Sequence, residues 1–86
     1  MRSHKIYETE YVIGVFRPDG SHIYMTWDGC GAYGDSCSPV GAEKFDSAEE
    51  AHDWLRKDPD AREWFENNPN AKVVQMVSRY TVYPPR

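Results

Sequence analysis

The chain has 86 residues, 40% of them hydrophobic, which is enough for one small domain and excludes a second. Ten Lys and Arg against fourteen Asp and Glu leave a formal net charge of −4, which argues against phosphate binding driven by bulk positive charge. No apolar run approaches the roughly 20 residues of a membrane-spanning helix, and no charged-then-apolar leader opens the chain. We therefore expect a cytoplasmic protein without a membrane partner.

The segment 5–27 is predicted to form a β-hairpin. Residues alternate along its first arm, so that Tyr11 and Ile13 lie on the same side of an extended chain. Pro18 and Gly20 suit the turn, because proline pre-sets the backbone and glycine adopts the positive φ of a bulged hairpin. The second arm alternates in the same way and has one apolar and one polar face.

Residues 28–44 are predicted to form a long loop, because they contain four of the six glycines and both cysteines. A loop of this length is uncommon in a compact domain unless it is functional or contains an unrecognised strand, so it is the first place to look for function. Cys30 and Cys37 are expected to be reduced thiols. A small disulfide ring and a metal site remain alternatives, although a zinc site needs four ligands and the three histidines are scattered.

Two helices are predicted within 47–68. Ser47 and Glu50 form an S-x-x-E capping box, so the first helix is expected from residue 48 to about residue 57. Asp58 and Pro59 end this helix and begin the second one as its N-cap and first residue, and Asn-Pro at 68–69 stops it. Several large side chains are assigned to the core beneath these helices: Trp27, Trp54, Trp64, Phe65 and Met76.

A third strand is predicted at 72–83, followed by an extended tail at 84–86. The fold class is therefore α+β, with a small three-stranded antiparallel sheet in ββααβ order and two short helices packed on one face.

The face of the sheet without helices is predicted to carry both polar and apolar side chains: His22, Tyr24, Gln75, Arg79, Val12, Phe16, Val73 and Val77. This is more apolar surface than a small monomer usually exposes. A protein partner, a second copy of the chain or part of the 28–44 loop folding back are alternatives for covering it. Such a face also suits base stacking, but the acidic chain argues against direct nucleic-acid binding.

Acidic residues gather in the helical half, where residues 43–70 carry nine acids and four bases. Such a surface is often only solvated, but it also suits a basic partner. We predict that the chain binds a partner through its acidic helical side or through its open sheet face. The residues assigned to these two surfaces are Glu49, Glu50, Asp53, Asp60, Glu63, His22, Tyr24 and Arg79.

No catalytic set is predicted. Gly34-Asp35-Ser36 is superficially similar to a hydrolase nucleophile motif, but an activated serine needs a positioned base and an oxyanion hole on a rigid scaffold. We therefore expect a non-enzymatic protein with no cofactor and no metal ligands.

The segment AEKFDSAEEA at 42–51 is an A-x-x-F-x-S-x-E-E-A helix entry. Together with the hairpin, the Gly-rich connector and the Val-rich last strand, from about Tyr11 to Val77, it resembles the small accessory proteins encoded by bacteriophages and prophages. The resemblance implies that the protein acts in a bacterial host cell by binding and modulating or inhibiting a host protein, and anti-CRISPR inhibitors of CRISPR-Cas are one such group. The alternatives are a metal or redox module using Cys30 and Cys37, and a structural homodimer.

Overall fold

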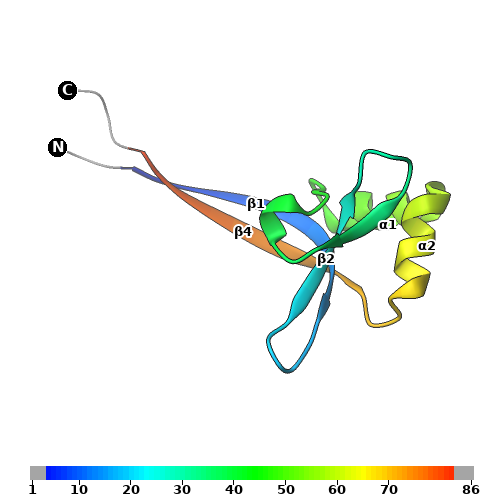
Figure 1. Ribbon diagram of the computed structural model, residues 1–86. Coiled ribbons are helices and arrows are strands. Elements are labelled where there is room, and N and C mark those ends of the chain that lie inside the picture. The colour runs from blue at the N-terminus through cyan, green and yellow to red at the C-terminus, as the bar shows by residue number, and fades with distance from the viewer. Residues whose placement is uncertain (1–3, 83–86) are drawn as a thin grey trace.

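The computed structural model describes residues 4–82 and has an antiparallel sheet with two α-helices on one face (Figure 1). The elements are β1 (His4–Phe16), β2 (His22–Trp27), β3 (Tyr33–Ser36), a 3-10 helix η1 (Pro39–Gly41), α1 (Ala48–Lys57), α2 (Pro59–Asn67) and β4 (Lys72–Val82). The predicted α+β class and the antiparallel sheet are confirmed. The predicted tail at 84–86 and the last residue of the predicted third strand lie outside the described residues.

The prediction of three strands is wrong, because the sheet has four, in the order β3-β2-β1-β4. The extra strand β3 lies inside the predicted loop and pairs antiparallel with β2, from Trp27↔Tyr33 to Tyr24↔Ser36. The order along the chain is therefore βββααβ. The sequence YGDS lacks the β-branched residues typical of strands, so its extended conformation comes from pairing with β2 and not from local preference.

The turn between β2 and β3 is closed by one carboxylate. Asp28 Oδ1 accepts hydrogen bonds from the backbone N–H of Cys30 at 2.7 Å and of Ala32 at 3.2 Å. Gly29 and Gly31 have φ of 82° and 95°, a region that other residues rarely adopt. This turn returns the chain alongside β2.

The two helices begin where their capping residues predict. Ser47 Oγ accepts from the backbone N–H of Glu50 at 3.0 Å, and Asp58 Oδ1 accepts from the N–H groups of Asp60 and Ala61 at the start of α2. None of the helices in the described part of the chain is long and apolar enough to cross a membrane.

The main core lies between the helices and one face of the sheet. Its buried members come from every layer: Ile13, Val15, Met25, Phe45, Ala51, Leu55, Ala61, Trp64 and Ala71. Ile13 and Met25 are fully buried, and burial of side chains of this size stabilises a fold by about 1.5–3 kcal/mol each. Of the large side chains assigned to the core by sequence, only Trp64 is buried in it, with Phe65 packed against it.

The opposite face of the sheet is partly covered by the chain itself. Val12, Tyr24 and Ala42 form a second buried cluster, against which Val74 and Met76 pack. Thr26 Oγ1 donates to the carbonyl of Gly41 at 2.5 Å and so holds the end of the 28–44 segment on the sheet. Part of the 28–44 segment therefore folds back over the face without helices, which was one of the alternatives for covering it.

The last strand was predicted to place Val73, Gln75, Val77 and Arg79 on the face of the sheet without helices. This prediction is wrong, because the alternation along the strand is shifted by one residue relative to β1. The register pairs Val12 with Val74 and Ile13 with Val73, so Val73, Gln75, Val77 and Arg79 lie on the helix side of the sheet. Val74 and Met76 share the face of Tyr24 instead. The alternation within the strand was predicted, but the phase depends on which residues pair across strands.

Beyond the body of the domain, β1 and β4 form a two-stranded arm. Their pairing runs from His4↔Val82 to Gly14↔Lys72, whereas β2 pairs with β1 only at residues 14–16. Figure 1 shows this arm projecting away from the helices. In the order of the sheet, β4 is an edge strand.

Candidate functional site

Three aromatic side chains from three different elements meet at the edge of the helix-covered face. The rings of Trp27 in β2 and Tyr33 in β3 are 5.1 Å apart between centroids and pack edge to face. Trp54 of α1 donates its indole Nε1–H to the Tyr33 hydroxyl oxygen at 2.8 Å. Tyr33 is partly buried between the two indoles, and we call these three residues the aromatic surface.

The aromatic surface is exposed although its residues are large and apolar. Trp27 is 46% exposed and Trp54 is 39% exposed. Both were assigned to the core from sequence, and that assignment is wrong for both. Trp and Tyr are enriched among the residues that dominate protein-binding energy, so exposed rings of this kind mark a candidate binding surface.

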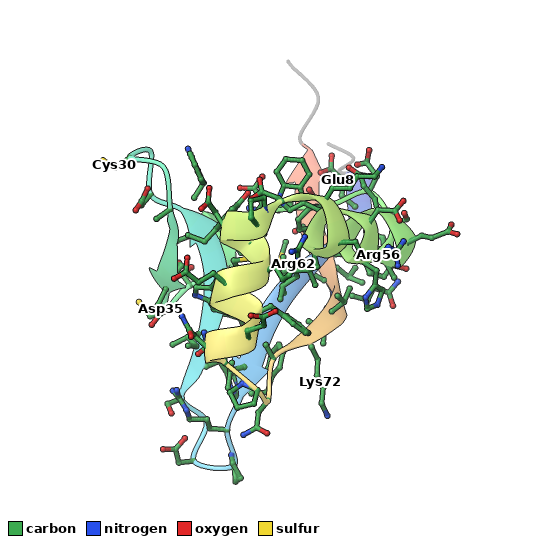
Figure 2. All side chains as sticks on the ribbon, turned by 90° about the vertical axis from the view of Figure 1, so that its right-hand side faces the viewer. Glu8, Cys30, Asp35, Arg56, Arg62 and Lys72 are labelled. Carbon is green, nitrogen blue, oxygen red and sulfur yellow. The ribbon has the colours of Figure 1, made fainter. Side chains whose placement is uncertain are left out.

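A second tryptophan-based contact fixes the strand on which the aromatic surface is built. Trp64 of α2 is buried and donates its indole Nε1–H to Asp35 Oδ1 at 2.8 Å. Tyr33 and Asp35 are two residues apart in β3, so both side chains point to the helices. Figure 2 shows Asp35 on β3 beside α2. Each helix therefore holds β3 through one tryptophan indole. α1 holds it through Trp54 bonded to Tyr33, and α2 through Trp64 bonded to Asp35.

The carboxylates of Glu43, Asp58 and Asp60, which we call the acidic rim, act electrostatically on the Tyr33 phenol. Burial raises the pKa of the Tyr33 phenol above its ordinary value of 10.0, and the hydrogen bond from Trp54 lowers it in part. The negative charges of the acidic rim raise this pKa further. The aromatic surface therefore lies in a negative electrostatic environment.

The corner between α1 and α2 places part of the acidic rim. Asp58 is the C-cap of α1, where its N–H donates to the Trp54 carbonyl at 2.9 Å, and also the N-cap of α2. Arg62 braces the corner by donating to the carbonyls of Leu55 and Arg56, and Figure 2 shows it against the end of α1. Asp60 follows Asp58 in the first turn of α2.

The eight partner-binding residues predicted from sequence do not form one site. Glu49, Glu50, Asp60 and Glu63 are exposed on the helices, and Asp53 forms an ion pair with Arg56. Only Asp60 belongs to the acidic rim.

The remaining three predicted residues lie on the sheet. His22 and Tyr24 are on the face without helices, where Tyr24 is buried, and His22 Nδ1 accepts from the Arg17 N–H at 3.2 Å. Arg79 is on the arm, in the phase of the helix-covered face. The structure therefore separates Arg79 from His22 and Tyr24, which the sequence placed together.

The aromatic surface was missed by sequence reasoning, although two signals point to it. Trp54 lies beside the buried stripe of Ala51 and Leu55 and not within it, so part of its ring faces solvent. Trp27 is the last residue of β2, and the end of this strand is less buried than its middle. Tyr33 carried no signal, because its strand was not predicted.

The two cysteines lie at opposite ends of β3. Both are exposed and free: Cys30 is in the β2–β3 turn and Cys37 follows Ser36 (Figure 2 labels Cys30). The four residues of β3 span roughly 10 Å between their outer Cα atoms, which exceeds the Cα separation of a disulfide. A ring between these thiols therefore requires the backbone to move. Among the residues that the structure describes, no three or more His, Cys, Asp or Glu side chains form a group able to hold a metal ion.

Comparisons of this chain with protein-family models, with curated proteins and with solved structures find no match.

Proposed function

We propose that this chain is a non-enzymatic binding module that uses the aromatic surface to bind and modulate another protein. The observation that carries the proposal is the exposure of two indole rings held in place by Tyr33, at 46% for Trp27 and 39% for Trp54. Rigid aromatic side chains lose little conformational entropy on binding and bury a large area, which is the chemistry of interface hot spots.

The resemblance of the helix entry at 42–51 to small bacteriophage accessory proteins supports a bacterial host protein as the partner. On this proposal the chain acts in the cytoplasm of the host cell, and inhibition of a defence system such as CRISPR-Cas is one outcome of the binding. Of the two surfaces considered from sequence, we favour the acidic helical side, because the exposed Trp54 of α1 belongs to it and bonds to Tyr33 of the aromatic surface.

The test is a pull-down from bacterial lysate at low and physiological salt, with wild-type protein and three variants. Trp27→Ala and Trp54→Ala each remove one exposed ring, and Val40→Ser removes an apolar side chain that is 80% exposed in η1. We expect a stoichiometric partner that is retained by Val40→Ser and lost from both tryptophan variants. Urea denaturation of each variant shows whether it is folded. Recovery of no stoichiometric partner, or of one that binds all variants equally, contradicts the proposal.

A structural homodimer is a second candidate, and the arm favours it. A two-stranded ribbon is only marginally stable in water, and an unpaired edge strand is a template for pairing with another chain. The β4 edge carries Val77, which is 51% exposed. Analytical ultracentrifugation tests this candidate. A dimer that dissociates in Val77→Lys supports it, and a monomer at micromolar concentration contradicts it.

A further inference from the structure

The region around the aromatic surface has more negative charge than its own bases neutralise. Residues 43–70 carry nine acids and four bases. Three of these bases are held by the chain itself: Lys44 donates to the carbonyls of the connector, Arg62 donates to those at the end of α1, and Arg56 is paired with Asp53. The carboxylates of the acidic rim are the charged groups that act on the Tyr33 phenol.

We propose that the aromatic surface binds a basic segment of the partner, with an arginine or lysine side chain lying against its rings and facing the acidic rim. This inference rests on the proposed function, because it names the chemistry of the partner at the same surface. The faces of indole and phenol rings attract cations, tryptophan most strongly, and a guanidinium also stacks on them.

The acidic rim selects the sign of the partner. An apolar segment that covered the rings would also remove water from these carboxylates while supplying no hydrogen-bond donor of its own, which is costly. A basic segment supplies hydrogen-bond donors and positive charge to the same groups. A nucleic acid would bring phosphates against the acidic rim and is repelled. The rings and the acidic rim are therefore complementary to the same ligand.

The test uses a short peptide in which arginine alternates with serine, and a second peptide with neutral citrulline in place of each arginine. The indole N–H signals of the three tryptophans are followed by NMR in ¹⁵N-labelled full-length protein. We expect the arginine peptide to shift the signals of Trp27 and Trp54. The signal of Trp64, which is buried and bonded to Asp35, serves as an internal control and stays in place.

Variants then separate the rings from the charges. Trp54→Ala is expected to weaken binding of the arginine peptide about fivefold, in line with about 1 kcal/mol for a cation over an exposed ring. Asp60→Asn is expected to weaken binding of this peptide about threefold at low salt and less at high salt. The matched control is Asp19→Asn, which removes the same charge in the β1–β2 turn, roughly 20 Å from Trp27 along β2, and should leave binding unchanged.

Equal shifts with the arginine and citrulline peptides would overturn the inference about charge while leaving the aromatic surface as a binding surface. No shift of either exposed indole at millimolar arginine peptide would also overturn it, and so would a shift caused by a single-stranded oligonucleotide. None of these results decides the proposed function, which depends on loss of the lysate partner from the tryptophan variants. A partner that depends on both tryptophans but not on the acidic rim keeps the proposed function and rejects a basic ligand.

Discussion

Replacement of Gly14 by alanine is expected to destabilise the protein, because there is no room for a methyl group at this position of β1. A Cβ at residue 14 would lie 2.9 Å from Cδ1 of Tyr24, 3.0 Å from the carbonyl oxygen of Ile23 and 3.3 Å from Cε2 of Phe16. The Tyr24 ring has some freedom to turn. The Ile23 oxygen does not, because it belongs to the backbone of β2, where Val15 pairs with Ile23.

The size of the effect follows from two opposing contributions. Overpacking of a filled site costs about 1–3 kcal/mol. Alanine also reduces the conformational entropy of the unfolded chain, which offsets about 0.4–1 kcal/mol of this cost. We therefore expect Gly14→Ala to lower the free energy of unfolding by roughly 1–2 kcal/mol, which for a domain of this size is a drop in Tm of roughly 4–16 °C.

The matched control is Gly34→Ala in β3. A Cβ at Gly34 has no atom within 4 Å, so the variant is expected to lie within about 0.5 kcal/mol of wild type or above it. Urea denaturation followed by far-UV circular dichroism measures both variants. If Gly14→Ala is as stable as wild type, or if both variants lose the same stability, the steric reasoning is refuted.

Three further predictions concern the helix cap, the phenol and the thiols. Ser47→Ala removes the acceptor for the Glu50 N–H and should lower the free energy of unfolding by about 1 kcal/mol. Ser47→Asp keeps an acceptor at the N-cap and should keep this stability, so equal urea midpoints for the two variants would contradict the prediction. The raised pKa of Tyr33 gives stability that is fully present below pH of about 10 and is lost as pH rises through the folded pKa. Tyr33→Phe should therefore show a shallower loss of urea midpoint in this alkaline range, and an unchanged profile would oppose the assignment. Cys30 and Cys37 are exposed, so a thiol reagent should titrate two groups per native chain, and a lower count would indicate a disulfide or a bound metal.

The candidate site was predictable only in part, for reasons that differ between its residues. Asp60 was predicted as a partner-binding residue, because charge on a helix surface is visible in the sequence. The exposure of Trp54 depends on how far α1 extends over the sheet, and a helical pattern alone does not specify this. Tyr33 depended on a strand without local strand preference, held by pairing with β2 and by the indoles of Trp54 and Trp64.

Local signals in the sequence determined the β1–β2 turn, both helix starts and the α+β class. Each signal acts over a few residues: Gly20 with its φ of 86°, the Ser47 and Asp58 caps, and the alternation along the strands. The tertiary structure decided the existence of β3, the phase of β4 and the exposure of the aromatic surface. These features are set by contacts between residues far apart in the chain, because pairing register and the coverage of a sheet by its helices are properties of the packed molecule.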